Sequence, residues 1–237
     1  MGSKKQRAVV TGATRGIGFA IAKRLIKDGI EVIATGTKRD AKYPDGAIYH
    51  SVDFLNDESV NSFIAFLKEQ KIDILINNAG INKIGEFALI DIEDYDQIMR
   101  VNLRTPFQLC QAVIPNMKNN NWGRIVNLTS IFGNITKEYR APYSSSKFGL
   151  DGMTAALSAE VSEFDILANS VGPGFIDTDL TRNVLGDKGI AKIQKSIPMK
   201  RLGRVDEIAS LVSWLVSEEN TYISGQNLMI DGGFSRV

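Results

Sequence analysis

Seven short apolar runs recur along this 237-residue chain, and helical patterns separate nearly all of them. Within most runs the apolar residues follow one another directly, whereas a strand with one solvent-facing side would alternate apolar and polar residues. Strands of this kind occur in parallel sheets that helices cover on both faces. The runs span 7–11, 31–35, 47–53, 72–80, 123–130, 165–174 and 226–233.

The helical patterns complete a repeated strand–helix unit. In the first of them Ile17, Ile21 and Leu25 recur every fourth residue. Further helices are expected at about 56–69, 91–118, 143–162 and 205–216. The segment 37–46 is short and contains a proline and a glycine, so we expect a loop or a single turn there. Because no linker interrupts the pattern, residues 1–237 are predicted to form a single Rossmann-type doubly wound α/β domain, with a seven-stranded parallel sheet and helices on both faces.

The composition sets the context for function. Apolar residues make up 43% and charged residues 23%, as in ordinary globular proteins, and the net charge of +1 gives no basis for binding nucleic acid or a membrane. The chain has no apolar run of about 18 residues, so we expect a cytoplasmic protein. Its one cysteine, Cys110, suits a reducing compartment. Its one histidine, His50, has no neighbouring ligand with which to hold a metal, so no metal site is expected.

The segment TGATRGIG lies between the first strand and the first helix, with glycines at 12, 16 and 18. Gly12 permits a tight turn, and the missing side chains at Gly16 and Gly18 let a pyrophosphate approach backbone N–H groups at the positive end of a helix. Glycines in such turns are also often purely structural, and the spacing differs from G-x-G-x-x-G. Because of its place between a strand and a helix, we interpret the segment as a nucleotide-binding turn.

A second group of polar residues follows the middle strands. Tyr143 and Lys147 are one turn apart on the same face of a predicted helix, and Ser130 ends the strand before that helix. Asn77 and Asn78 end the preceding strand. Because ligands bind at the carboxyl ends of parallel strands, we expect these residues to meet at one edge of the sheet. No histidine is placed to activate Ser130 as a nucleophile.

Together these motifs resemble those of the compact short-chain dehydrogenases/reductases. The chain carries their T-G-x-x-x-G-x-G at 11–18, N-N-A-G at 77–80, Y-x-x-x-K at 143–147 and P-G-x-x-x-T at 173–178. The resemblance implies four catalytic residues, Asn102, Ser130, Tyr143 and Lys147. It also implies cofactor contacts from Gly12, Thr14, Arg15, Gly16, Ile17, Gly18, Thr37, Lys38, Arg39, Asp53, Asn77, Ala79, Gly80, Tyr143, Lys147, Pro173, Gly174, Ile176 and Thr178.

The resemblance also implies a reaction, in which hydride passes between a nicotinamide cofactor and a carbonyl or carbinol carbon. Tyr143 would donate the proton in reduction and accept it in oxidation, while Ser130 would hydrogen-bond the substrate oxygen. Lys147 would lower the pKa of Tyr143 and bind the nicotinamide ribose. Pro106 has no N–H for the carbonyl of Asn102, so we expect a kink whose freed carbonyl holds a water leading towards Lys147. The alternative is a helix that simply bends around the core.

The substrate stays open at this stage. The overall pattern is similar to 3-oxoacyl-acyl carrier protein reductases, which implies a 3-oxoacyl thioester and a place in fatty acid biosynthesis. Lys137, Glu138 and Arg140 indicate a more polar pocket or a solvated turn, and a sugar, polyol or hydroxy acid is the alternative substrate. A dinucleotide sensor without catalysis is a third possibility, against which the complete catalytic set argues. The resemblance implies a homodimer or homotetramer built through the long helices.

The end of the second strand selects the cofactor in such folds, because an acidic side chain there binds the ribose 2′-OH and repels a 2′-phosphate. Gly36 occupies the position where NAD-selective relatives carry Asp. Thr37, Lys38 and Arg39 follow it, and Arg15 projects to the same neighbourhood. Unless these cations are only solvated loop charges, they predict a preference for NADP(H) over NAD(H) of at least about tenfold in kcat/KM. Replacing Gly36 with Asp is expected to reverse it.

Overall fold

A single sheet of seven parallel strands organises the computed structural model, which describes residues 5–237. The strands are β1 (Arg7–Val10), β2 (Glu31–Gly36), β3 (Ile48–Ser51), β4 (Ile74–Asn77), β5 (Gly123–Leu128), β6 (Ile166–Pro173) and β7 (Asn227–Ile230). Their spatial order is β3-β2-β1-β4-β5-β6-β7, and they lie within the predicted runs except that β2 extends one residue further, to Gly36. The winding direction reverses between β1 and β4, which opens the crevice where doubly wound sheets bind ligands.

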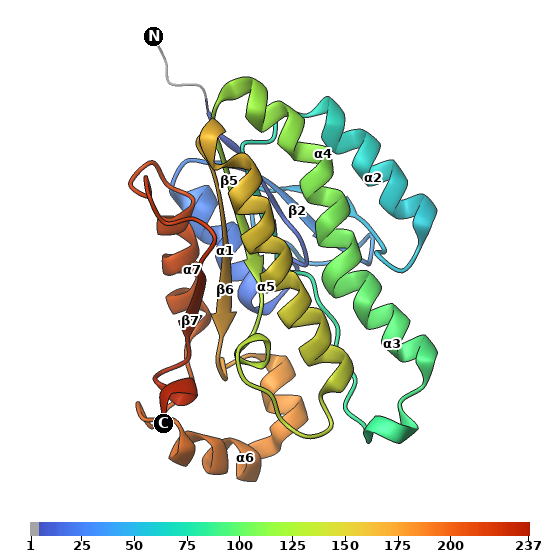
Figure 1. The fold of residues 1–237 in the computed structure, drawn as a ribbon, viewed down its shortest axis with the longest axis vertical. Helices are drawn as coiled ribbons and strands as arrows, with labels where there is room; N and C mark the ends of the chain where they lie inside the picture. Colours follow the sequence, from blue (N-terminus) through green and yellow to red (C-terminus); the bar gives the residue numbers. More distant parts are fainter. Residues whose placement is uncertain (1–4) are drawn as a thin grey trace.

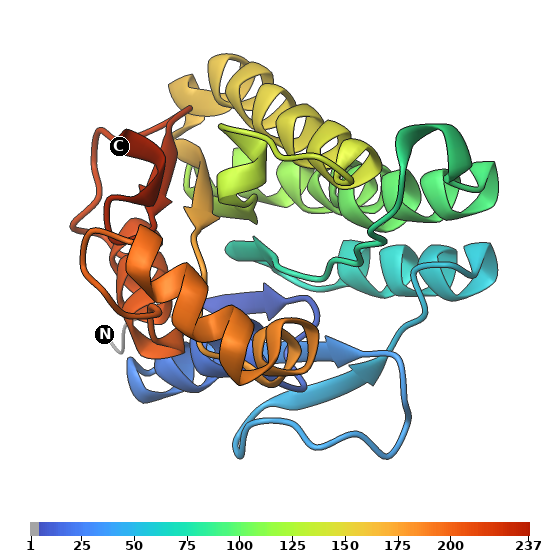
Figure 2. The same cartoon turned by 90° about the horizontal axis from the view of Figure 1, so that it is seen from below.

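Helices cover both faces of this sheet, as predicted (Figure 1, Figure 2). They are α1 (Gly16–Lys27), α2 (Asp57–Glu69), α3 (Ile92–Met99), α4 (Thr105–Asn120), α5 (Ala141–Val161), α6 (Asp179–Ser196) and α7 (Val205–Leu215). α1 and α7 pack on one face, and α2, α4 and α5 pack on the other. No helix in the described part of the chain is long and apolar enough to cross a membrane.

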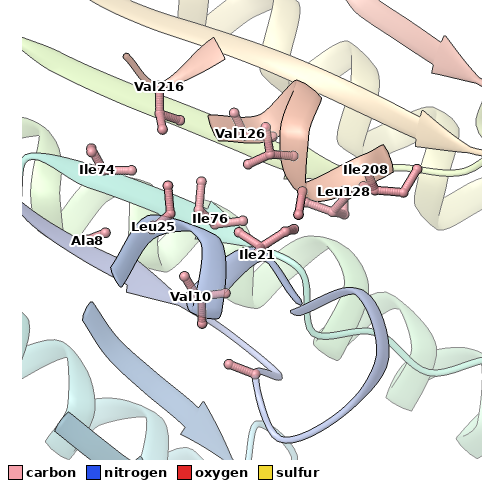
Figure 3. Close-up of a cluster of buried hydrophobic side chains, with 14 of the residues drawn as sticks. Ala8, Val10, Ile21, Leu25, Ile74, Ile76, Val126, Leu128, Ile208 and Val216 are labelled. Carbon is pink, nitrogen blue, oxygen red and sulfur yellow. The ribbon is translucent and has the colours of Figure 1, made fainter. Parts of the chain in front are cut away.

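Successive residues of a strand pack alternately into the two apolar layers, one on each face of the sheet. In β1, Ala8 and Val10 belong to the layer of α1 and α7, whereas Val9 belongs to the layer of α2 and α4. Figure 3 shows the first layer, with Ile21 and Leu25 of α1 close to Val10. Full burial of such a side chain contributes about 1.5–3 kcal/mol, so an unbroken apolar strand stabilises both faces of the sheet.

The sequence pattern does not predict α6. Its side chains are mostly exposed or half-buried, so it lacks the apolar stripe that reveals the other helices. Gly186 interrupts it with φ 59° and ψ 175°. Thr178 caps its start, because the Thr178 hydroxyl accepts the N–H of Thr181.

Two local expectations concern irregular backbone. The segment 37–46 contains no helix, as predicted. The helix expected at 91–118 consists of α3, the π-helical turn η2 (Arg100–Arg104) and α4. Pro106 lies in the first turn of α4, and the N–H of Thr105 donates to the carbonyl of Arg100, five residues earlier. The helix therefore departs from α geometry beside Pro106, while a water at the Asn102 carbonyl stays a prediction.

Candidate active site

The glycine turn between β1 and α1 has a backbone that only glycine adopts without strain. Gly12 and Gly16 have φ of +64° and +56°. A Cβ added at Gly12 would come within 3.0 Å of the Ala79 Cα, and one added at Gly18 would lie 2.3 Å from the Asn78 Nδ2. These glycines therefore let β1, α1 and the residues after β4 approach one another closely.

Side-chain hydrogen bonds join the carboxyl ends of β1 and β4. The Thr11 hydroxyl accepts the N–H groups of Asn78 and Ala79 at 2.9 and 3.0 Å. In return the Asn78 Nδ2 donates to the carbonyls of Thr11 and Gly12. The Asn77 side chain instead lies in the core, where its Nδ2 donates to Asn127 Oδ1 at 2.8 Å. Any contact that Asn77 makes with the cofactor must therefore come from its backbone atoms.

The start of α1 is open to an anion. Arg15 precedes the helix with an extended backbone and makes no side-chain cap, and the first turn contains no acidic residue. The caps of α2 and α6, by contrast, accept N–H groups from their own first turns. Because the first N–H groups of α1 have no side-chain partner, this end keeps its positive potential. Ile17 in this turn packs against the core.

The end of β2 is tightly packed. A Cβ added at Gly36 would lie 2.3 Å from Thr14 Cγ2 and 2.9 Å from the Tyr49 hydroxyl oxygen. That hydroxyl donates to the Lys38 carbonyl, and the Tyr49 ring stacks on Tyr43 with centroids 4.7 Å apart. The sequence predicts that Gly36→Asp alone reverses the cofactor preference. In the structure the added Cβ would press on Thr14, so the reversal needs a second change there.

The predicted cations lie beside this strand end. Arg15, Lys38 and Arg39 are exposed, and none of them forms an ion pair with a carboxylate of the described residues. Thr37 is fixed through its carbonyl, which accepts the hydroxyl of Ser51 at 3.0 Å. Asp53 follows β3, and its Oδ1 accepts the N–H of Leu55 at 2.9 Å.

On the other side of the crevice, Asn102 and Lys147 are buried next to Gly80. A Cβ added at Gly80 would lie 3.4 Å from Asn102 Oδ1 and 3.6 Å from Lys147 Nζ. Asn102 pairs with the backbone of Ile81, accepting its N–H and donating to its carbonyl, both at 2.9 Å. Lys147 donates to the Leu128 carbonyl at 2.7 Å. Asn102 therefore fixes the segment after β4, while Lys147 joins α5 to the end of β5.

Ser130 and Tyr143 lie near Lys147. Ser130 follows β5, and its hydroxyl accepts the N–H of Phe132 at 3.2 Å. Lys147 Nζ is 5.7 Å from the centroid of the Tyr143 ring. Burial raises the pKa of Tyr143, while an interaction with the Ser130 side chain and the charge of Arg140 oppose that rise. The net direction is opposite to the predicted one, because burial outweighs the nearby charges and also lowers the pKa of Lys147 to about 8.

The segment after β6 closes the crevice next to the glycine turn. A Cβ added at Gly16 would lie 3.6 Å from Thr178 Cγ2. Gly174, which follows Pro173, donates its N–H to the Ile230 carbonyl, and a Cβ there would lie 2.7 Å from the Asp231 Cα. Ile176 is buried and pairs with Gly203. The structure thus brings the four predicted motifs to one edge of the sheet.

Known proteins share this arrangement over nearly the whole chain. A family model described as Enoyl-(Acyl carrier protein) reductase matches residues 12–235. The 3-oxoacyl-[acyl-carrier-protein] reductase of Aquifex aeolicus is 37% identical over 95% of this chain and 96% of its own. The acetoacetyl-CoA reductase of Cupriavidus necator shows the same identity and coverage. This chain belongs to the short-chain dehydrogenase/reductase family.

Solved structures support this membership of the short-chain dehydrogenase/reductase family. A gluconate 5-dehydrogenase from Burkholderia cenocepacia, in complex with NADP and tartrate, superimposes with a TM-score of 0.90 at 28% identity, covering 98% of this chain and 96% of its own. YwfH, an NADPH-dependent reductase involved in bacilysin biosynthesis, gives 0.91 at 25% identity, covering 99% of this chain and 100% of its own. The protein is therefore an oxidoreductase that interconverts a ketone and a secondary alcohol with a nicotinamide cofactor.

Three residues of this short-chain dehydrogenase/reductase site have structural roles that the sequence prediction did not assign to them. Thr11 and Asn78 hold the glycine turn to the end of β4 and are absent from the predicted contacts. Both lie within the T-G-x-x-x-G-x-G and N-N-A-G motifs, so their place in these motifs was the sequence signal that could have revealed their roles. Ser146 is a third such residue, because its hydroxyl accepts from Asn102 Nδ2 at 3.0 Å and donates to the Tyr143 carbonyl. Only the fold shows that Ser146 connects these two catalytic candidates.

Proposed function

We propose that this short-chain dehydrogenase/reductase is an NADP(H)-dependent ketoreductase in which Tyr143 exchanges a proton with the substrate oxygen. The observation that carries the proposal is the meeting of Tyr143, Ser130 and Lys147 at the end of β5, across the crevice from the glycine turn. Burial favours the neutral phenol of Tyr143, which is the form that donates a proton in reduction. The bound cofactor supplies the hydride.

Each neighbouring residue has one part in this proposal. Ser130 hydrogen-bonds and orients the substrate oxygen, and it stabilises negative charge there. Lys147, positioned by the Leu128 carbonyl, binds the nicotinamide ribose hydroxyls. Asn102 fixes the backbone of Ile81 and thereby the wall beside Gly80.

The test of this function is Tyr143→Phe. The variant should lose at least about a hundredfold in turnover, since positioned general acids contribute about 10²–10⁴-fold. Its affinity for NADPH, measured by fluorescence titration, should stay within about twofold of the unmodified protein. The matched control is Tyr139→Phe, because Tyr139 lies in the same segment and is 49% exposed. Retained turnover in Tyr143→Phe would remove Tyr143 from the mechanism. NADPH binding without turnover of any carbonyl by the unmodified protein would favour a sensor.

The cofactor proposal rests on the three exposed cations Arg15, Lys38 and Arg39 and on Gly36. No acidic side chain occupies the end of β2, and the cations have no carboxylate partner in the described residues. The glycine turn and the start of α1 also suit a pyrophosphate, because the N–H groups there lack a side-chain cap. The 2′-phosphate of NADP(H) therefore has ready partners, and we expect it to be preferred over NAD(H).

Two substrate classes have specific support. The names of the 37% identical relatives describe reductases of 3-oxoacyl thioesters. This favours a 3-oxoacyl compound as the substrate. The gluconate 5-dehydrogenase of similar structure favours an acid of the sugar or polyol type. Both substrates carry a ketone or secondary alcohol that Tyr143 and Ser130 can hold. NADPH oxidation with 3-oxoacyl thioesters, oxo acids and sugar ketones separates the classes.

The remaining parts of the proposal concern the whole protein. Because the seven strands form one sheet, we propose that the chain is one dinucleotide-binding and catalytic domain. Cys110 is buried, and burial raises its pKa to about 12, which agrees with a structural thiol in the cytoplasm. A homodimer or homotetramer is proposed through α4 and α5, where Phe107 and Phe148 are 49% and 46% exposed.

A further inference from the structure

The arginines of the described residues divide into two groups. Most of them pair with Asp or Glu within 4 Å, and these are Arg7, Arg24, Arg100, Arg104, Arg124, Arg182, Arg201 and Arg204. Arg15 and Arg39 have no such pair, and the proposed cofactor phosphate accounts for both. Arg140 and Arg236 also have no ion pair with the described residues, and Arg140 lies three residues before Tyr143. Arg140 is therefore the arginine next to Tyr143 whose charge neither an ion pair nor the proposed cofactor phosphate accounts for.

The surroundings of Arg140 keep its charge at the active site. The guanidinium carbon lies 5.4 Å from the centroid of the Phe132 ring, two residues after Ser130. Phe132 is buried, and its ring meets Phe175 edge-on with centroids 6.4 Å apart. Phe175 directly follows Gly174, at the end of β6. An aromatic wall therefore holds the cation over the Phe132 ring and partly shields it from water.

The local backbone favours a negative group at the same place. Arg140 is the residue before the first turn of α5, and that turn contains no acidic residue and no side-chain cap. Burial lowers the pKa of Arg140, and the charge that Tyr143 carries when it is ionised opposes this shift. Glu138 and Lys137 in the same segment are exposed, and Glu138 does not pair with Arg140. The charge on Arg140 is thus partly desolvated without a partner from the chain, which an anionic ligand would supply.

We propose that Arg140 binds the carboxylate of an oxo acid or hydroxy acid substrate and so selects the free acid over its ester or thioester. The proposal rests on the proposed function, because it assumes that Tyr143 and Ser130 hold the reacting oxygen. A guanidinium offers two parallel N–H donors to a carboxylate, and its position at the start of the helix that carries Tyr143 suits a carboxylate a few bonds from the carbonyl. The apolar rings beside it accommodate the carbon chain between the two groups.

The test compares free acids with their methyl esters. Pyruvate, acetoacetate and levulinate place the ketone one, two and three carbons from the carboxylate, and each has a neutral methyl ester with the same ketone. We expect at least one acid to exceed its ester by tenfold or more in kcat/KM with NADPH. Arg140→Gln should lower kcat/KM for that acid by about ten- to a hundredfold, mainly through KM, and change the ester less than about threefold. Lys137→Gln is the matched control, because it removes an exposed cation from the same segment.

A second measurement separates binding from catalysis. Acetoacetate should bind to the complex of Tyr143→Phe with NADPH in a calorimeter, and the double variant with Arg140→Gln should bind it at least tenfold more weakly. Equal losses for acid and ester in Arg140→Gln would assign Arg140 to the reaction at Tyr143 and overturn the proposal. So would the absence of a preference for any acid over its ester. Should no carbonyl be reduced at all, the proposed function fails, while the calorimetric comparison still decides whether Arg140 binds carboxylates.

Discussion

Gly36 links cofactor choice to packing at the scale of a single residue. Asp at this position should favour NAD(H), because its carboxylate binds the ribose 2′-OH and repels a 2′-phosphate. Gly36→Asp alone should instead weaken the binding of both cofactors, since its Cβ would lie 2.3 Å from Thr14 Cγ2. Adding Thr14→Ser removes that methyl group. We expect the double variant to prefer NADH in kcat/KM, and Thr14→Ser alone to keep the preference for NADPH.

The control for this prediction is Arg15→Ala, which removes a cation without crowding β2. It should lower kcat/KM with NADPH by roughly tenfold and leave that with NADH nearly unchanged, since one charge-assisted contact is worth about 1.5–3 kcal/mol. Equal activity of the unmodified protein with both cofactors would contradict the role given to these cations. An active single Gly36→Asp variant that prefers NADH would contradict the packing argument.

Lys147 makes the stability of the cofactor-free protein depend on pH. Burial lowers its pKa from 10.5 to about 8, so the folded protein binds this proton less tightly than the unfolded chain. The stability linked to the neutral amine is therefore complete above pH 10.5 and is lost as the pH falls towards 8. Relative to Lys147→Met, the free energy of unfolding should rise by up to about 3 kcal/mol between these pH values. Urea denaturation of both proteins at pH 8 and 10 measures this difference, and a difference that does not change with pH would contradict it.

These residues show where sequence reasoning ends. The motifs predicted that Ser130, Tyr143 and Lys147 meet at one edge of the sheet, because Ser130 follows a strand and the other two share a helix turn. Asn102 lies in the π-helical turn η2, and only the family resemblance assigned it to the site. The direction of the Tyr143 pKa shift was wrong, because it depends on burial by distant segments. The contact of Thr14 with Gly36 could not be predicted from the sequence either, because it joins two different βα units.

At the scale of elements, Arg124 connects β5 to two loops. It is 2% exposed, and its guanidinium donates to the carbonyls of Gly123, Asp165 and Asn220 at 2.7–3.1 Å. Arg124→Met leaves buried carbonyls without a donor, and each such group costs about 1–3 kcal/mol. We expect the free energy of unfolding in urea to fall by about 2–4 kcal/mol. Arg24→Met is the control, because its exposed pair with Asp28 should contribute less than about 1 kcal/mol. Equal effects of the two substitutions would refute the structural role of Arg124.

The helices and strands could be predicted where burial imposes a regular pattern of apolar residues on the sequence. Strands buried on both faces give continuous apolar runs, and helices such as α1 and α7 present one apolar stripe to the sheet. α6 has no such stripe, so its helical conformation left no signal in the sequence. Its Gly186, with φ of +59°, also reads as a helix breaker.

At the scale of the whole molecule, one outer surface remains unusually apolar. A groove of about 980 Å³ runs between α3, α4 and α5, and Leu103, Phe107 and Met153 line it together with Ile92. Ile92 and Phe107 are 71% and 49% exposed. Glu93, Asp96, Arg100 and Arg104 also line it, so both signs of charge occur on one face. A surface that offers both signs beside apolar rings can pair with a copy of itself across a two-fold axis.

We therefore expect Phe107→Asp to dissociate the protein, because the substitution replaces an apolar ring with a carboxylate that must lose its water in the pairing. Light scattering after gel filtration should give a dimeric or tetrameric mass for the unmodified protein and a smaller mass for the variant. Ile48→Asp is the control, since Ile48 is 47% exposed but lies on the edge strand β3, outside the groove. A monomeric mass for the unmodified protein would contradict the pairing. If only Ile48→Asp lowered the mass, the interface would instead lie at the sheet edge.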